Sequence, residues 1–97
     1  MFYTAEITNI VKDDINELSD YIFRISFDKE IAKKIYNELY AAIFSLELLP
    51  NRYEKYLWEY RKMIVKWSYK IYYKVDEENK KAIIIRVTRA EQNTFKI

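Results

Sequence analysis

Basic side chains at alternate positions mark the last third of the chain. In the stretch YKIYYKVD, Lys70, Tyr72 and Lys74 alternate with apolar residues, and Arg86 takes the corresponding position in the next apolar run. Successive side chains of a β-strand point to opposite faces of its sheet. The spacing therefore predicts one sheet face that carries cations and a tyrosine hydroxyl, which suits an acidic protein segment or an RNA as the partner.

Three residue types are missing from the chain, and each absence removes a class of chemistry. The sequence contains no cysteine, no histidine and no glycine. Without the first two it lacks a disulfide framework, a thiol nucleophile, a Cys/His zinc site and an imidazole base. Without glycine it lacks the phosphate-binding loops of the common nucleotide folds. We therefore expect no metal and no cofactor.

Size and charge limit the possibilities further. The 97 residues predict a single domain spanning positions 1–97. The 17 basic and 15 acidic residues give a net charge of only +2, so basic character must be local. No leader pattern and no stretch of about 18 apolar residues occurs, which predicts a cytoplasmic protein without membrane association.

The N-terminal part of the chain predicts a strand followed by a helix. Residues 2–8 alternate and are rich in β-forming types, whereas residues 10–25 place apolar side chains at three- and four-residue spacings. Thr8 or Asn9 is suited to cap this helix. We expect its acidic residues, which include no convergent set of metal ligands, to form a solvated face: Asp13, Asp14, Glu17 and Asp20.

A second helix is expected to form a hairpin with the first. Asp28 is a suitable N-cap, and Pro50 is expected to end the helix, because the residue before a proline disfavours the α conformation. The very short link between the helices predicts antiparallel packing. Its apolar stripe comprises Ile31, Ile35, Leu39, Ala42, Ile43, Leu46 and Leu49.

Three further strands follow from Tyr60 onward, after an aperiodic connection. The predicted order is β-α-α-β-β-β, an α+β fold with the helical hairpin packed on one face of a small, mainly antiparallel sheet. The residues expected to face the core are Met63, Val65, Tyr69, Ile71, Tyr73, Val75, Ile83, Ile85 and Val87. The residues expected on the open face are Lys62, Lys66, Lys70, Tyr72, Lys74, Ile84, Arg86 and Thr88.

The connection NRYEKYLWEY is rich in aromatic residues: Tyr53, Tyr56, Trp58 and Tyr60. Aromatic side chains in so small a domain commonly cover the core. If exposed, the same side chains would instead anchor a partner protein, or more weakly stack on unpaired bases. Both interpretations remain open from the sequence.

Several stretches together resemble one known family over nearly the whole chain. KDDINELSDYI and AIFSLELLPNRY are similar to the first helix and the end of the second helix of the RelE/ParE superfamily, the toxins of type II toxin–antitoxin pairs. YRKMIV, YKIYYKVDEE and IIIRV resemble its closing strands. The long paired helices and the lack of histidine are more similar to the ParE branch than to the RelE-like or YoeB-like ribonucleases.

The resemblance implies a growth-arresting toxin held inactive by a cognate antitoxin in a hetero-oligomer. ParE-type toxins poison DNA gyrase, whereas RelE-like toxins cut messenger RNA on the ribosome; a non-toxic interaction domain is the third interpretation. On the resemblance, the open face becomes the expected antitoxin-binding surface, with Lys62, Lys66, Lys70, Tyr72, Lys74 and Arg86 as its contacts.

For the ribonuclease interpretation, the resemblance implies catalytic candidates in Arg61, Lys70, Arg86, Arg89 and Tyr72. Cations would stabilise charge on the phosphoryl group, and an acid would protonate the leaving oxygen. At the C-terminus the chain departs from the ribonuclease pattern, because Ala90 and Gln92 replace basic residues and Phe95 has no hydroxyl. Tyr72 or Glu91 is the remaining acid candidate, and this weak site favours the gyrase poison.

Overall fold

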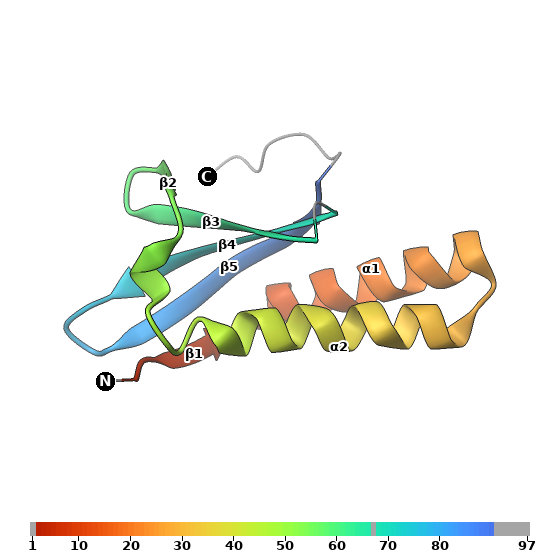
Figure 1. Cartoon of the computed structure of the whole chain (residues 1–97), viewed down its shortest axis with the longest axis horizontal. Coiled ribbons are helices and arrows are strands. Elements are labelled where there is room, and N and C mark those ends of the chain that lie inside the picture. The colour runs from red at the N-terminus through yellow and green to blue at the C-terminus, as the bar shows by residue number, and fades with distance from the viewer. Residues whose placement is uncertain (1, 67, 91–97) are drawn as a thin grey trace.

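Two helices pack on one face of a five-stranded sheet in the computed structural model, which describes residues 2–66 and 68–90 (Figure 1). The sheet order is β1-β5-β4-β3-β2, with β1 parallel to β5 and the remaining pairs antiparallel. This arrangement confirms the predicted α+β class and the order of its main elements. The elements are β1 (Thr4–Ile7), α1 (Asn9–Ser26), α2 (Lys29–Ser45), a 3-10 turn (Pro50–Arg52), β2 (Lys55–Leu57), β3 (Tyr60–Val65), β4 (Tyr69–Asp76) and β5 (Lys81–Arg89).

Both helices begin at the caps that the sequence predicts. The Thr8 hydroxyl accepts a hydrogen bond from the backbone N–H of Val11, 3.3 Å away. The Asp28 carboxylate accepts two backbone N–H bonds from the first turn of α2, the shorter from Glu30 at 2.8 Å. Such caps satisfy N–H groups that a helix leaves without partners. Neither helix in the described part of the chain has the length and apolar character needed to cross a membrane.

The end of α2 differs from the sequence prediction. The helix stops at Ser45, well before Pro50, and the chain turns back toward the sheet. Leu46 is buried as expected, but Leu49 is 63% exposed and adopts a left-handed conformation. Pro50 instead begins the 3-10 turn, and its carbonyl accepts a hydrogen bond from the buried Tyr73 hydroxyl. The prediction that Pro50 terminates the helix is therefore wrong, because this turn ends it first.

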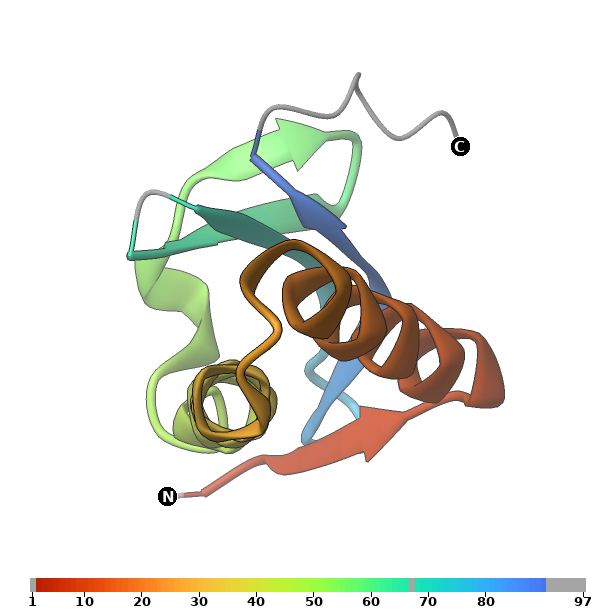
Figure 2. The same ribbon diagram turned by 90° about the vertical axis from the view of Figure 1, so that its right-hand side faces the viewer.

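The core lies between the helical hairpin and one sheet face. Figure 2 looks along the hairpin and shows both helices on the same side of the twisted sheet. In Figure 1 the closed end of the hairpin projects past the strands, and Ile25, Phe27 and Ile31 are exposed there, although Ile31 was expected on the apolar stripe of the second helix. The buried cluster comprises Val11, Ile15, Leu18, Leu39, Ile43, Leu46, Met63, Val65, Tyr69, Ile71, Tyr73, Ala82, Ile84 and Val87.

A β-bulge in β5 changes which of its residues face the core. Tyr72 lies opposite Arg86 and Tyr73 lies opposite Ile84, so Ile85 is an extra residue on this strand. Before the bulge, Ile84 is fully buried, and after it Val87 is buried. The expectation that Ile84 lies on the open face, and Ile83 and Ile85 on the core face, is therefore wrong. The bulge reverses the inside–outside alternation within one apolar run.

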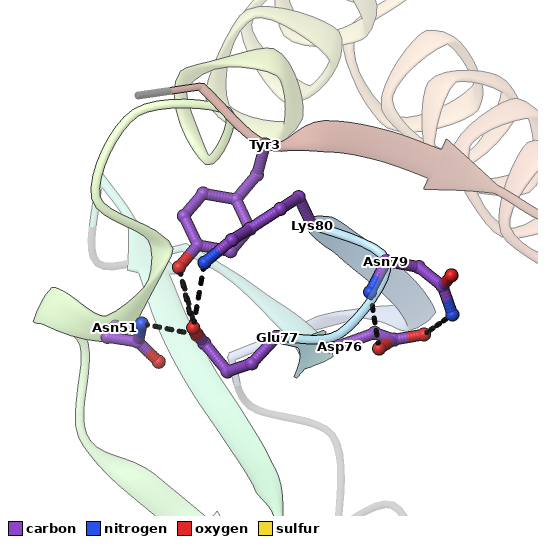
Figure 3. A network of polar contacts seen from close by, with 6 residues as sticks. All are labelled: Tyr3, Asn51, Asp76, Glu77, Asn79 and Lys80. Atoms are coloured by element: carbon purple, nitrogen blue, oxygen red, sulfur yellow. Dashed lines mark hydrogen bonds and ion pairs between the residues drawn. The ribbon is translucent and has the colours of Figure 1, made fainter.

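The turn between β4 and β5 is tied to two distant segments by Glu77 (Figure 3). The Glu77 carboxylate accepts hydrogen bonds from the Tyr3 hydroxyl at 2.8 Å and from the Asn51 side-chain amide at 2.9 Å. Both bonds lower the pKa of Glu77, and the bond from Asn51 has the larger effect. The segment at Tyr3 that leads into β1, the 3-10 turn and the β4–β5 turn are thereby held together at one end of the sheet.

Candidate partner-binding surface

On β4, the side chains that point to the sheet face away from the core are those of Lys70, Tyr72 and Lys74. They alternate with Ile71 and Tyr73, which are fully buried on the helix side. Residues directly opposite each other on neighbouring strands share a face. The register therefore forms three rows across this open face: Ile64–Lys70–Thr88, Lys62–Tyr72–Arg86 and Tyr60–Lys74–Ile83.

Tyr72 forms the floor of the open face and is almost fully buried, with 1% exposure. The ring of Tyr56 from β2 lies against it, with 5.0 Å between ring centroids. Burial raises the pKa of the Tyr72 hydroxyl, nearby Tyr56 raises it further, and a hydrogen bond with Thr88 lowers it. Tyr72 consequently remains a neutral phenol at physiological pH, which suits packing better than proton transfer.

The lysines around this floor differ in how they are held. Lys62 lies 3.7 Å from Glu54 and 5.5 Å from the centre of the Tyr56 ring. Lys70 and Lys74 are partly exposed, and neither is in an ion pair within residues 2–66 and 68–90. These two ammonium groups are therefore the cations of the open face most readily offered to a partner.

Lys66 does not belong to the open face, contrary to the sequence prediction. It follows the end of β3 in a left-handed conformation, and its ammonium group lies 3.1 Å from Glu38 on α2. The alternation that placed it with Lys62 and Ile64 ends at Val65, because the strand ends there. Its side chain therefore reaches toward the helix side of the sheet.

Arg86 lies in the row of Tyr72 but is bound by α1. Its Nε and Nη2 donate to the two carboxylate oxygens of Asp14, at 2.8 and 2.9 Å. Asp14 also accepts the backbone N–H of Val87 at 3.0 Å and is only 7% exposed. The expectation that Asp14 lies on a solvated face is therefore wrong. A sequence signal existed, because Asp14 lies on the helical stripe of Val11 and Leu18.

Arg61 lies on the opposite side of the sheet from Lys70. It is directly across from the buried Tyr73, and its Nη1 donates to the carbonyl of Tyr53 at 2.7 Å. Lys70 pairs with Ile64, three residues further along β3. The candidate ribonuclease cations are therefore divided between two faces.

Arg89 lies at the far end of β5, where a pocket of about 200 Å³ opens between this strand and α1. Its guanidinium carbon lies 4.2 Å from the centre of the Tyr21 ring, a cation–π geometry. Glu17 and Arg24 also line this pocket. The departures at Gln92 and Phe95, and the acid candidate Glu91, lie outside the described residues.

The connection before β3 adopts more structure than its sequence indicates. It contains the short strand β2, which pairs with the start of β3. Tyr53 packs against the core and Tyr56 against Tyr72, whereas Trp58 is 67% exposed. Tyr53 therefore helps to cover the core, as one interpretation of the sequence expected. Among the described aromatic residues of this connection, only Trp58 presents a large ring to solvent.

These features define a small α+β protein with a helical hairpin and a basic open sheet face. The chain belongs to the ParE toxin family of type II toxin–antitoxin systems (parDE), whose family model matches residues 5–94. A comparison with curated protein sequences finds no match.

Solved structures of toxin–antitoxin systems share the fold. The chromosomal ParDE system of Pseudomonas aeruginosa superposes with a TM-score of 0.77 and 17% identity, covering 93% of this chain and 98% of that one. The RelBE2 toxin–antitoxin complex of Mycobacterium tuberculosis gives 0.64 and 21%, covering 94% and 95%. A free variant of the Escherichia coli toxin RelE gives 0.62 and 16%, covering 94% and 86%. At these identities the likeness establishes the fold.

Proposed function

We propose that this protein arrests growth by binding DNA gyrase in the cytoplasm, without catalysing a reaction itself, and that a cognate antitoxin neutralises it. Membership of the ParE family supports a toxin within a two-protein system. The observation that carries the choice of target is the dispersal of the candidate catalytic groups. Arg86 is engaged by Asp14, and Arg61 bonds to a carbonyl on the opposite sheet face.

Ribonuclease chemistry needs its groups to converge on one phosphate. Donors must lie where charge develops, and an acid and a base must reach the leaving oxygen and the attacking hydroxyl. Here Lys70 is accessible, but Tyr72 is buried beside Tyr56 with a raised pKa. A surface with accessible lysines and few candidate acid–base groups is better suited to binding a protein than to cutting RNA.

The antitoxin is expected to cover the open face and the helical hairpin. The ammonium groups of Lys70 and Lys74 form no ion pair within residues 2–66 and 68–90. Together with the basic row of Lys62 and Arg86 they offer complementarity to an acidic or amphipathic segment. The exposed apolar side chains of the hairpin, among them Phe27 and Ile31, offer anchoring area for the rest of the same partner.

A ribosome-dependent messenger-RNA endoribonuclease is the second candidate. The observation that favours it is the presence of Lys70, Lys74 and Arg86 on one sheet face, which is a suitable surface for a phosphate backbone. Under this alternative, RNA cleavage would require Arg86 to exchange Asp14 for a phosphate on the ribosome. A non-toxic interaction domain would use the same face for its partner alone.

Two assays with purified protein separate these functions. We expect inhibition of gyrase supercoiling or trapped cleavage complexes, and intact messenger RNA after addition to translating ribosomes. Ribosome-dependent cuts at defined codon positions would overturn the proposal, provided that Lys70→Ala abolishes them in a folded protein. Loss of one transition-state donor typically lowers the rate by about 10²- to 10³-fold. Inactivity in both assays, with no effect on growth, would leave the interaction domain.

A further inference from the structure

The pocket of about 200 Å³ between α1 and the end of β5 is lined mainly by polar groups. It has room for several water molecules, and therefore for a small ion. Five of its nine lining side chains are charged, three of them positively and two negatively. The charged residues are Asp14, Glu17, Arg24, Arg86 and Arg89.

The two carboxylates of the pocket act on the same guanidinium group, that of Arg86. Asp14 accepts two hydrogen bonds from Arg86 and a third from the backbone N–H of Val87. The hydrogen bond to Asp14 raises the pKa of Arg86, and the charges of Asp14 and Glu17 raise it further. The negative charge of the pocket is therefore concentrated at its Arg86 end.

Two further arginines line the other end and come from different elements. Arg24 is in the last turn of α1, and seven residues, about 10 Å along the helix axis, separate it from Glu17. Arg89 comes from β5, and its guanidinium carbon lies 4.2 Å from the centre of the Tyr21 ring. Tyr21 and Arg24 are three positions apart and are therefore neighbours on the helix surface. Both cations consequently line the pocket beside Tyr21.

This pair of arginines is suited to hold an anion between α1 and β5. Arg24 is exposed and forms no ion pair within residues 2–66 and 68–90. Arg89 is oriented by stacking on Tyr21, so its planar guanidinium loses little conformational freedom when it binds a ligand. Like charges on the two elements repel each other, whereas an anion between them attracts both. Such an anion would join the helix to the strand.

The arrangement favours phosphate over other small ions. A cation is poorly suited, because Asp14 is already engaged and Glu17 alone remains to bind it. A carboxylate has two oxygens in one plane, which a single guanidinium satisfies, as in the Asp14–Arg86 pair. A phosphate group carries up to two negative charges and offers three acceptor oxygens on different sides. Two guanidinium groups from separate elements match this shape and charge.

We propose that the pocket between α1 and β5 binds a phosphate group, with Arg24 and Arg89 as its ligands and Tyr21 as the platform that orients Arg89. Inorganic phosphate and the phosphate of a nucleotide share this chemistry. The site goes beyond the proposed function, because it requires neither the accessible lysines of the open face nor a partner protein.

Neutralising one arginine tests the site in the full chain. Arg24→Gln removes a ligand at an exposed helix position. Lys12→Gln makes the same charge change near the other end of α1, outside the pocket, and is the matched control. The probes are sodium phosphate, adenosine 5′-monophosphate and sodium malonate, with sodium chloride at equal ionic strength as the reference. NMR titration measures affinity and location together, and thermal unfolding checks the fold of each variant.

Phosphate is expected to shift the Nε–H signals of Arg24 and Arg89 and to raise the unfolding temperature above that in chloride, because it binds the folded state. Arg24→Gln should weaken phosphate binding by at least about tenfold, the loss of one charged hydrogen-bond donor group. Lys12→Gln should change it by less than about twofold, because solvent and salt screen distant surface charges. Arg24→Lys, which keeps the charge but not the planar fork, should lie between the two.

Three results would overturn the inference. Arginine signals that move no more in phosphate than in chloride would show that the pocket binds no phosphate. Equal losses in Arg24→Gln and Lys12→Gln would show a general effect of surface charge. Malonate that binds as tightly as phosphate would show a carboxylate site instead.

Comparison of the two phosphate probes identifies the source of the ligand. Tighter binding of adenosine 5′-monophosphate than of inorganic phosphate, with the same dependence on Arg24, supports the inference with a nucleotide as the ligand. Binding of inorganic phosphate that is equal or tighter supports it with the free ion. Gyrase inhibition and growth arrest are separate measurements, so failure of the proposed function leaves these results unchanged.

Discussion

The carboxylate of Asp14 and the guanidinium of Arg86 form a bidentate pair that joins α1 to β5, with N–O distances of 2.8 and 2.9 Å. The parallel strand β1 ends opposite Ile84, so the last part of β5 has no strand on that side within the described chain. There the same carboxylate accepts the N–H of Val87 at 3.0 Å. One acidic residue therefore covers an exposed sheet edge and also fixes a cation of the open face.

Replacing Asp14 should destabilise the fold more than replacing its neighbour. Asp14→Ala leaves the Val87 N–H and the Arg86 guanidinium without this partner, and we expect a loss of about 2 kcal/mol, below the cost for a fully buried pair because the Arg86 side chain is 40% exposed. Asp13→Ala, at an exposed position of the same helix, should change stability by less than about 0.5 kcal/mol. Urea unfolding measures both values.

A double-mutant cycle then isolates the pair. Asp14→Ala and Arg86→Ala, alone and together, should show a coupling free energy of about 1–2 kcal/mol, typical of side chains joined by charge-assisted hydrogen bonds. Additive effects would show that Asp14 acts only through the Val87 backbone.

Local chemistry in the sequence accounts for much of the fold. Thr8 and Asp28 have the side chains that helix N-termini need, and both act as caps. Strict alternation in β4 predicts that Ile71 and Tyr73 face the core and that Lys70 faces away, as they do. Such features depend on neighbours a few residues away, which is why a single sequence reveals them.

The features that the sequence did not reveal depend on distant partners. The run AIII at residues 82–85 is apolar at successive positions, so its own pattern neither marks the bulge at Ile85 nor assigns Ile84 to the core. β2 has no period of its own and exists through pairing with β3. Asp14 is buried because Arg86 lies beside it, 72 positions further along the chain. Such pairings are set by tertiary contacts rather than by local pattern.

Alkaline pH should remove part of the stability that Tyr73 provides. Burial raises its pKa from 10.0 to about 12, so the unfolded chain loses this proton first. The stabilisation is complete below about pH 10 and is lost between pH 10 and about 12, with a slope of at most about 1.4 kcal/mol per pH unit. The Tyr73→Phe variant has no ionisable group at this position. It also lacks the hydrogen bond from the Tyr73 hydroxyl to the Pro50 carbonyl.

Denaturant unfolding of both proteins at about pH 9 and about pH 11 checks this prediction, because the other tyrosines are common to the two chains. The stability advantage of the wild type should narrow at the higher pH. An advantage that stays constant across this range would contradict the raised pKa.

Expression of the chain alone should arrest growth, and co-expression of the small protein encoded beside it should restore growth. The expectation follows from membership of the ParE toxin family. Colony counts after induction, with soluble full-length protein confirmed, measure the effect. Normal growth under those conditions would contradict a toxic activity.

Charge reversal on the open face should weaken antitoxin binding. Lys70 and Lys74 are the suitable pair, because both are on this face without an ion pair in the described structure, whereas reversal of Arg86 would also break its contact with Asp14. The combined change Lys70→Glu and Lys74→Glu should weaken the complex by about ten- to a hundredfold, mainly through faster dissociation. Lys12→Glu with Lys29→Glu makes the same charge change on the helical hairpin, the other surface that the antitoxin is expected to cover, and serves as the comparison. Surface plasmon resonance measures both rates. If the helical variant loses more affinity than the sheet variant, the antitoxin binds chiefly along the hairpin, and the open face is not its main contact.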